Sequence, residues 1–473
     1  MEPASTDILT PVRFRRFRDQ LLITNEAGSY SFVPEDTIDR LLSGSLSQEQ
    51  DRALRDLSIL IAPDARWRLA SLARTAREAT RRAAHMAYLI IVPTLRCNLR
   101  CTYCQVSRAP LRAHGYDWGT TELDQFEHLL DTIDTDSIKI EFQGGEPTLR
   151  PDLIRKVVQM CRPRFNHTEF IICTNLTQID DDLLELFDDP DIRLSTSIDG
   201  DLATMTANRT QSLEVSRTIQ ANLDLIRHRF GPGKVSALPT ITDYQIDQPE
   251  DLVDLYVRLG FRSIFLRPVN YMGFARKAFA ELSRSADRWD QFYERAIAHI
   301  IHVNRDTYVE EFYLSTLLRT IFTRSPSGFV DFRSPAHFYD DYCVIDFDGA
   351  IYPTDEARML TRTGEVDLRI GSLAQGVDVQ RLDTLNFNAV NQVDPDCTHC
   401  AYMPFCGTDL IDDLSRYGRI DTPRHDTWFC RRHMFLFDLI FDKVARWDQN
   451  WLDVFATWIA RGDLELPTRV LFE

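Results

Sequence analysis

The chain has 473 residues, more than a single hydrophobic core usually organises, so two or three domains are expected. Its 54 Lys and Arg residues against 71 Asp and Glu residues give a net charge of −17, which makes nucleic acid a poor partner. Neither residues 1–20 nor any later stretch has the apolar run of a signal peptide or a membrane span. These observations predict a cytoplasmic protein that binds neither nucleic acid nor a membrane.

A small β-plus-α module is predicted over residues 1–63. Its expected strands and helices are, in order, "RFRRF", "QLLIT", "SYSFV", "TIDRLLSG" and "SQEQDRALRDLSIL". Gly28 lies in the turn before the third strand, and Gly44 and Pro63 end the two helices. Residues 64–85 then form an arginine-rich connecting helix, for which a solvated surface is the simplest interpretation.

From residue 86 to residue 275, apolar strands alternate with helices. The six predicted strands are "AYLIIVPT", "SIKIEFQ", "TEFIICTN", "IRLSTSID", "KVSALPTIT" and "RSIFLRPV". This alternation implies a parallel sheet whose functional residues lie at the carboxyl ends of the strands. The predicted fold class is therefore α/β, with a partial (β/α)6 barrel of the TIM type.

The rest of the chain divides into a helical linker and a cysteine-bearing region. Residues 276–340 are expected to be mainly helical. Residues 341–473 are expected to be rich in loops, with a hairpin at "DFDGAIYPTDEAR" and a last helix at about 430–460. Ten cysteines in a long chain without secretion signals favour metal ligation over disulfides wherever they cluster.

Three cysteines fall within eight positions of "LRCNLRCTYCQ", directly after the first barrel strand. Thiolates of Cys97, Cys101 and Cys104 can hold three corners of a 4Fe-4S cluster, which leaves the fourth iron open to another ligand. An open position is typical of a catalytic metal site. Structural zinc is the alternative, but it wants four ligands, and the nearest further candidate, His114, lies ten residues beyond Cys104.

This C-x3-C-x2-C motif, with Tyr103 before its last cysteine, resembles the radical S-adenosylmethionine (radical SAM) superfamily. The resemblance implies that S-adenosylmethionine binds at the open iron. The turn "EFQGGEP" ends the second strand, and in the superfamily such a turn holds the amino group of S-adenosylmethionine. The residues that the resemblance assigns to this turn are Gln143, Gly144, Gly145, Glu146 and Pro147. Taken alone, a Gly-Gly-Glu-Pro sequence is more often a simple turn.

Further cofactor contacts are implied at the ends of the third and fourth strands. In similar peptide-modifying members, a serine and an arginine that match Ser197 and Arg209 contact the ribose and the carboxylate of the cofactor. Arginine suits a carboxylate because its planar fork is bidentate. For Ser197 a hydrogen bond at the strand end is an equal alternative. Asn175, which ends "TEFIICTN", belongs to the same implied cofactor-binding set.

A second cysteine group has the spacing C-x2-C-x5-C-x23-C. Its members are Cys397, Cys400, Cys406 and Cys430. Spacing alone slightly favours structural zinc. The run also resembles the SPASM extension of radical SAM peptide maturases, which ligates auxiliary iron-sulfur clusters. Thr354 and Leu410 stand where that family has cysteines, so the resemblance implies a reduced, twitch-like SPASM domain with one auxiliary 4Fe-4S cluster.

The remaining titratable candidates carry weaker expectations. Asp355 matches an aspartate that acts as a base in sulfatase-maturing relatives, and a turn-forming role is at least as reasonable. Cys343 is interpreted as a relic of the second auxiliary site or as a buried thiol. Cys161 and Cys173 are predicted to be core residues.

A closer resemblance links most of the chain to the radical SAM maturase of His-Xaa-Ser peptide systems. It rests on "LLITNEAGSYSF", "TLRCNLRCTYCQVSR" and "EFQGGEP" in this order. It implies a ribosomally made precursor peptide, a partner protein encoded by a neighbouring gene, and an electron donor such as flavodoxin or ferredoxin. The amino-terminal module also resembles a winged-helix-like peptide-recognition element that adds a leader peptide as an edge strand, although a structural cap on the barrel is an equal alternative.

The leading hypothesis is a radical SAM oxidoreductase that abstracts hydrogen from a precursor peptide and leaves a crosslink. Residue oxidation of the sulfatase-maturing kind and peptide epimerisation are alternatives within the same chemistry. A non-catalytic iron-sulfur scaffold or redox sensor is the alternative of another class. The Gly-Gly-Glu-Pro turn and Arg209 argue against a sensor, because a sensor needs no surface for a cofactor.

Overall fold

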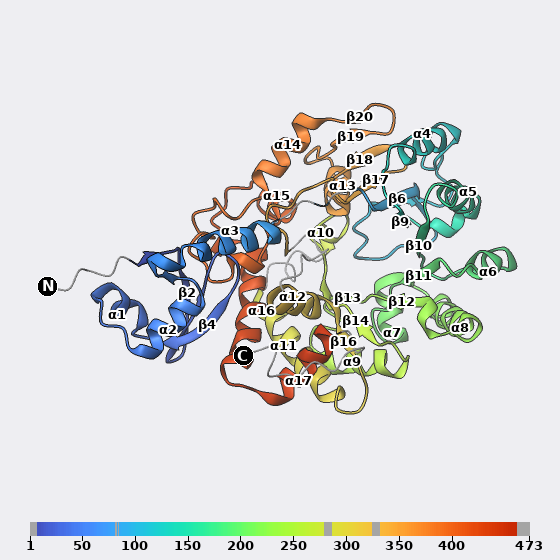
Figure 1. Cartoon of the computed structure of the whole chain (residues 1–473). Coiled ribbons are helices and arrows are strands. Elements are labelled where there is room, and N and C mark those ends of the chain that lie inside the picture. Colours follow the sequence, from blue (N-terminus) through green and yellow to red (C-terminus); the bar gives the residue numbers. More distant parts are fainter. Residues whose placement is uncertain (1–6, 81–82, 84, 279–285, 324–331, 461–473) are drawn as a thin grey trace.

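The computed structural model describes residues 7–80, 83, 85–278, 286–323 and 332–460 (Figure 1). In Figure 1 the amino-terminal module, in blue, lies at one end of the molecule and the helices that surround the main sheet lie at the other. Helix α16 (Trp428–Ala445), in red, runs between the module and the central helices. No helix of the described residues is both long and apolar enough to cross a membrane.

The strands and helices predicted within residues 1–63 are present. An antiparallel sheet has the order β2-β3-β4, and a short pair β1-β5 lies beside it. The bounds are β1 (Ile8–Leu9), β2 (Arg13–Phe17), β3 (Gln20–Thr24), β4 (Tyr30–Pro34), α1 (Thr37–Ser43), α2 (Gln48–Asp56), β5 (Leu60–Ile61), η1 (Pro63–Ala65) and α3 (Trp67–Ala79). Gly44 ends α1 with a φ of +68°, a left-handed conformation that glycine adopts at low cost. Leu21, Ile23, Val33 and Leu54 form the core of this unit.

Five parallel strands in the order β12-β11-β10-β9-β6 form the main part of a larger sheet. Their bounds are β6 (Tyr88–Thr94), β9 (Ser137–Gly144), β10 (His167–Cys173), β11 (Ile192–Thr196) and β12 (Val235–Ala237). The helices that follow these strands are α4 (Thr120–Leu130), α5 (Pro151–Cys161), α6 (Asp181–Phe187), α7 (Leu202–Met205), α8 (Leu213–Phe230) and α9 (Pro249–Arg258). The predicted α/β class is therefore confirmed, and the first four predicted strands match closely.

The fifth and sixth predicted strands are each broken in two. The fifth becomes β12 and β13 (Thr240–Ile241), and the sixth becomes β14 (Ser263–Ile264) and β15 (Arg267–Pro268). Strand β13 pairs with β15, and β14 pairs with β16 (Glu310–Glu311), outside the main sheet. Pro239 lies at the first break, where it has no N–H group for a continuous ladder.

The carboxyl-terminal region extends the same sheet from its other side. Strand β17 (Tyr342–Ile345) pairs in parallel with β6, and β18 (Ala350–Tyr352) returns antiparallel, so the predicted hairpin is present. Two short strands, β19 (Gly371–Ser372) and β20 (Gly376–Val377), complete a sheet of nine strands. A sheet that holds strands from both predicted regions gives the cysteine-bearing part a fixed position against the barrel.

The other helices cover the remaining surfaces. They are α10 (Ala275–Ala278), α11 (Ala286–Val303), α12 (Phe312–Thr323), α13 (Asp355–Arg362), α14 (Val379–Asn388), α15 (Leu410–Tyr417), α16 and α17 (Gln449–Ile459), with 3-10 or π turns η2 (Pro147–Leu149), η3 (Thr206–Thr210), η4 (Pro232–Lys234), η7 (Met403–Phe405) and η8 (Arg424–Asp426). The single last helix predicted at about 430–460 is two helices, because Trp447 between them has a φ of +50°.

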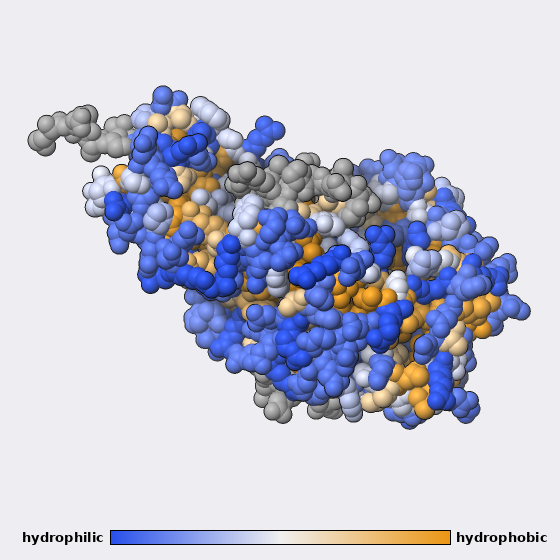
Figure 2. Space-filling model, turned by 90° about the horizontal axis from the view of Figure 1, so that it is seen from below, coloured by the Kyte–Doolittle hydropathy of each residue, from blue (hydrophilic) through white to orange (hydrophobic). Residues whose placement is uncertain are grey.

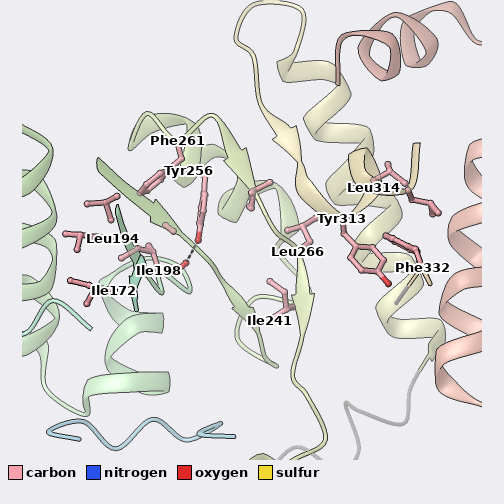
Figure 3. Packing of buried hydrophobic residues seen from close by; sticks show 14 of the residues in the cluster. Ile172, Leu194, Ile198, Ile241, Tyr256, Phe261, Leu266, Tyr313, Leu314 and Phe332 are labelled. Atoms are coloured by element: carbon pink, nitrogen blue, oxygen red, sulfur yellow. Dashed lines mark hydrogen bonds between the residues drawn. The ribbon is translucent and has the colours of Figure 1, made fainter. Parts of the chain in front are cut away.

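One continuous hydrophobic cluster joins the barrel to the central helices. Figure 3 shows part of it, with Ile172, Leu194 and Ile198 on the barrel side and Tyr313 and Phe332 on the helical side. The hydroxyl of Tyr256 donates a hydrogen bond of 2.8 Å to the carbonyl oxygen of Ile198, which satisfies a buried polar group within this cluster. Hydrophilic side chains cover most of the face seen in Figure 2, in keeping with the net charge of −17.

Candidate functional site

The first cysteine group lies in the loop at the carboxyl end of β6. Cys97 ends the short strand β7 (Arg96–Cys97), which pairs with β8 (Ala109–Pro110). Cys97, Cys101 and Cys104 are free thiols and line one cavity of about 330 Å³. Burial raises the pKa of the Cys97 thiol to about 12. Within the described residues, no three His, Cys, Asp or Glu side chains are arranged to hold a single metal ion.

The Gly-Gly-Glu-Pro turn packs directly under this cysteine loop. A Cβ atom at Gly144 would lie 2.2 Å from the carbonyl oxygen of Thr94, and one at Gly145 would lie 2.2 Å from the carbonyl oxygen of Arg96. The amide of Glu146 donates a hydrogen bond of 2.9 Å to Arg96 O. Both glycines are therefore required by the close approach of the two loops, which fixes Glu146 against the cysteine loop.

Glu146 lines the same cavity, and its carboxylate is held by protein donors. It is 2% exposed, and it accepts hydrogen bonds from the Asn175 amide at 2.7 Å and the Thr148 hydroxyl at 2.6 Å. Burial raises its pKa. The side chain of Asn175 donates to Asn98 Oδ1 at 2.8 Å, and its Nδ2 lies 4.0 Å from the sulfur of Cys97. Asn175 thus connects the carboxylate turn to the cysteine loop.

Ser197 and Arg209 also line this cavity. Arg209 is 7% exposed on the π-helical turn η3, and its Nη1 donates a hydrogen bond to the hydroxyl of Tyr103. Tyr103 in turn donates to Asp199 Oδ2 at 2.7 Å. Asp199 is fully buried, and burial raises its pKa. Asp199 is not among the predicted site residues, although an aspartate before the glycine of "STSIDG" is a visible signal.

Three buried polar atoms around this cavity have no hydrogen-bond partner among the described residues: Arg108 Nε, Thr196 Oγ1 and Arg209 Nε. Buried polar groups are normally hydrogen-bonded, so such a set is typical of a site for a polar ligand. Residues 91–264 match the family described as the Radical SAM superfamily. The chain therefore contains a radical SAM domain. This superfamily uses a 4Fe-4S cluster and S-adenosylmethionine, and the domain implies an enzyme.

Curated relatives resemble only short parts of this chain. An uncharacterized protein of Methanocaldococcus jannaschii is 33% identical over 117 residues, which cover 24% of this chain and 39% of that protein. Molybdenum cofactor biosynthesis protein 1 of Drosophila melanogaster is 38% identical over 77 residues, which cover 16% of this chain and 13% of that protein. The chain thus spans less than half the length of these relatives.

Solved structures resemble a larger part of the fold. The structure of anSMEcpe with bound AdoMet (S-adenosylmethionine) has a TM-score of 0.60 at 18% identity, and the likeness covers 77% of this chain and 99% of that one. Streptococcus suis SuiB bound to precursor peptide SuiA has a TM-score of 0.52 at 14% identity, with 90% and 100% covered. At these identities the likeness shows the fold, and it confirms the radical SAM partial barrel.

The side chains that line this cavity are suited to hold a 4Fe-4S cluster and S-adenosylmethionine. Three free thiols face one cavity, and a buried carboxylate and a buried guanidinium line its walls. Cys97, Cys101 and Cys104 would hold the 4Fe-4S cluster, and the walls around Glu146 and Arg209 would hold S-adenosylmethionine.

The inner face of β9 adds a polar group that the sequence analysis missed. Glu141 accepts hydrogen bonds from the hydroxyl of Tyr88, from Gln143 Nε2 and, at 3.4 Å, from the sulfur of Cys173. Cys173 lines the cavity, so its prediction as a core residue is wrong, because side chains of β10 at this position face the barrel interior. Cys161, by contrast, is fully buried as predicted. Alternation of Lys139, Glu141 and Gln143 with apolar residues was the available signal.

Asp355 also reaches the radical SAM cavity, from the first turn of α13. Its Oδ1 lies 2.9 Å from Nε of the fully buried Arg358. Burial raises the pKa of Asp355. Thr354, in the place of a family cysteine, caps α13 by accepting from the Ala357 amide at 3.0 Å. This position, in the first turn of a helix and on the cavity, is compatible with both interpretations of Asp355, a base and a turn-forming residue.

The second cysteine group lines a different cavity, of about 1110 Å³, together with residues of β2. Its four members are free thiols. Burial raises the pKa of Cys397 and of Cys430 to about 12. Leu410 and Cys343 are 2% and 0% exposed in hydrophobic clusters, so the interpretation of Cys343 as a buried thiol is confirmed.

Proposed function

We propose that this protein is a radical SAM peptide maturase that abstracts hydrogen from a ribosomally made precursor peptide and forms an intrapeptide crosslink. The observation that carries the proposal is the single cavity shared by the cysteine loop, the Glu146 turn and the polar inner face of the barrel. A peptide substrate is favoured because anSMEcpe and SuiB, which share the fold, have been solved with peptides bound.

Each cavity wall has a proposed task. When bound, the cluster and S-adenosylmethionine supply a 5'-deoxyadenosyl radical by reductive cleavage. Glu146, with the backbone of Gly144, Gly145 and Pro147, would bind the amino group of the cofactor, and Arg209 its carboxylate. Ser197, Asn175 and Gln143 would orient it. The buried walls exclude water from the reacting atoms.

Asp355 is the proposed proton acceptor from the substrate. It lines the cavity, and its Oδ1 is bound to Arg358, which leaves the second carboxylate oxygen for the substrate. Burial raises its pKa, which brings the carboxylate closer to the value that suits a base at neutral pH. Glu141 and Cys173 line the same cavity and would provide further polar contacts for a substrate, and the hydroxyl of Tyr88 donates a hydrogen bond to Glu141.

The outer regions are proposed to serve the same peptide. Cys397, Cys400, Cys406 and Cys430 would hold one auxiliary 4Fe-4S cluster in a reduced SPASM domain at 341–473, which would accept an electron as the substrate is oxidised. The module at 1–63 would bind the leader of a His-Xaa-Ser precursor. Flavodoxin or ferredoxin would reduce the clusters, and a neighbouring gene would encode a partner protein.

Alternative functions use the same cavity. Residue oxidation and epimerisation differ only in the fate of the substrate after hydrogen abstraction. A scaffold or redox sensor is less well supported, because three unpartnered buried polar atoms surround the cavity and a sensor has no use for a ligand there.

The test is anaerobic co-expression with a peptide encoded by a neighbouring gene, followed by high-resolution mass spectrometry. We expect the peptide to lose two hydrogens with the intact protein and to stay unchanged when Cys97, Cys101 and Cys104 are all replaced by alanine. The triple variant should also form no 5'-deoxyadenosine. Formation of 5'-deoxyadenosine by the triple variant would contradict the assignment of the three cysteines. In a repeat of the experiment in deuterated water, uptake of deuterium by the peptide without loss of two hydrogens would favour epimerisation.

A further inference from the structure

A third cavity, of about 140 Å³, shares Arg267 with the cavity of about 330 Å³ that is proposed to hold the cofactor. It is called the Arg267 cavity, and the larger one is called the cofactor cavity. The walls of the Arg267 cavity come from the segment 265–272, from helices α11 and α12, and from the carboxyl-terminal region. Figure 3 shows two of its lining residues, Leu266 and Tyr313, at the join between the barrel and the helices. An engineered cavity of about 150 Å³ holds a benzene molecule, so this one has room for a single side chain.

Helix α16 places this cavity between the two cysteine groups. Phe429, Arg432 and Leu436 on one face of the helix line the Arg267 cavity. Cys430, Met434 and Phe437 line the cavity of the second cysteine group. A substrate side chain in the Arg267 cavity would therefore lie beside the cofactor cavity. Helix α16 would separate it from the second cysteine group.

Three side chains of this cavity, Arg267, Trp289 and Thr408, have unused hydrogen-bond donors. Arg267 makes no hydrogen bond or ion pair within the part of the chain that the structure describes, and its guanidinium lies only over the ring of Phe265, at 5.8 Å. Trp289 Nε1 and Thr408 Oγ1 are buried and have no partner among the described residues. Trp289 and Thr408 are 3% and 4% exposed. Leaving buried donors unpaired costs free energy that a ligand acceptor would recover.

Two of the acidic residues that line the same cavity, Asp409 and Asp412, are held by groups of the protein. Both oxygens of Asp412 lie 2.8 Å from Nε of Arg416. Asp409 caps α15 by accepting from the amides of Ile411 and Asp412. Arg267 is thus a cationic side chain of this cavity without a hydrogen bond or ion pair in the described part of the chain, and the ligand that complements it is an anion with two acceptor oxygens.

We propose that Arg267, with Trp289 and Thr408, binds a carboxylate of the peptide substrate beside the cofactor cavity. The identity of the ligand as a peptide rests on the proposed function, whereas the preference for a carboxylate rests on the unused donors of these three side chains. The carboxylate belongs either to an acidic side chain or to the carboxyl terminus of the peptide, and both present the same two oxygens to the arginine fork.

The test measures binding without catalysis. The protein, reconstituted anaerobically and loaded with S-adenosylmethionine, is titrated with N-acetyl-glutamate N-methylamide, with N-acetylglycine and with the neutral N-acetyl-glutamine N-methylamide, using saturation-transfer NMR. We expect at least one carboxylate probe to bind about tenfold more tightly than the neutral probe, since hydrogen bonds to charged groups are the strong ones. Binding of N-acetyl-glutamate N-methylamide would identify an acidic side chain as the source of the carboxylate. Binding of N-acetylglycine would identify the carboxyl terminus.

Matched variants assign the preference to this site. Arg267→Gln should abolish it, Arg267→Lys should retain part of it, and Thr408→Val should weaken it a few-fold. Arg258→Gln, on the exposed surface of α9, should leave it unchanged. Equal binding of charged and neutral probes, or an undiminished preference in Arg267→Gln, would overturn the proposal. Loss of S-adenosylmethionine binding in Arg267→Gln would also overturn it, because Arg267 would then serve the cofactor. Failure of the proposed function would instead be seen as absence of 5'-deoxyadenosine from the wild-type protein.

Discussion

Gly145 shows how a single residue couples two parts of the proposed cofactor site. Its missing Cβ leaves room for the carbonyl oxygens of Leu95 and Arg96, which a Cβ would approach to 2.5 and 2.2 Å. The obstacle is backbone, which has no rotamer with which to move away. The glycine is therefore needed for the cysteine loop to lie on the Glu146 turn, whatever the cofactor contributes.

Replacing Gly145 with alanine should displace the cysteine loop. Forcing an extra carbon into a packed site costs typically about 1–3 kcal/mol. We expect a lower thermal midpoint and less iron per protein after anaerobic purification. Gly233→Ala is the matched control, because a Cβ there meets no atom within 4 Å. Equal iron content in both variants would show that the loop tolerates the shift.

At the residue scale, the sequence groups the cysteine motif with Glu146 better than it predicts the polar groups around them. Cys97, Cys101, Cys104 and Glu146 follow a spaced motif and do share one cavity. Glu141 and Cys173 belong to no motif, and their contact depends on two neighbouring strands whose side chains turn inward. A polar residue inside a barrel becomes recognisable only when the register of its strand is known.

At the scale of the elements, strand β16 holds the segment that carries Arg267. Glu311 is fully buried, and its Oε1 accepts from the Leu266 amide at 3.0 Å. Its Oε2 accepts from the Tyr293 hydroxyl and the Leu314 amide, both at 2.6 Å. One carboxylate thus joins β14 and β15 to α11 and α12.

This carboxylate should give the protein a pH-dependent stability. Burial raises the pKa of Glu311 to about 7, from a usual value of 4.5. Between these two values the folded state keeps the proton and the unfolded state releases it, so stability falls as pH rises. The loss is on the order of 3 kcal/mol. Glu311→Gln cannot ionise, and its thermal midpoint should therefore fall less than that of the wild type between pH 5 and pH 7.5. Parallel pH profiles would contradict this assignment.

The order of the elements was partly predictable. Strands β6, β9, β10 and β11 carry several apolar residues each, and the sequence alone predicts their positions. The pairing of β17 with β6 joins residues about 250 positions apart, and no local pattern encodes such a partner. The breaks in the fifth and sixth strands likewise reflect their pairing with each other and with β16.

At the scale of the whole molecule, the amino-terminal module and the second cysteine group form one continuous structure. Arg15 contacts both carboxylate oxygens of Asp438 on α16, at 2.6 and 2.5 Å. The hydroxyl of Thr24 donates to the carbonyl oxygen of Ala401 at 2.8 Å. These contacts lie beside Cys400. Deleting the module would therefore disturb the cysteine loop as well as any leader binding, so a deletion cannot separate the two effects.

Phe441 is the residue through which this whole-molecule coupling can be tested. It is 0% exposed on α16, and its ring lies 5.2 Å from that of Tyr30 in β4 and 5.7 Å from that of Tyr402. Removing a buried phenyl ring costs about 3–5 kcal/mol. Phe441→Ala should therefore lower the thermal midpoint and let a protease release an amino-terminal fragment faster, as followed by mass spectrometry. Phe387→Ala, at a side chain that is 81% exposed, is the control. If Phe441→Ala loses stability without faster release of this fragment, the module is held by its polar contacts rather than by the aromatic core.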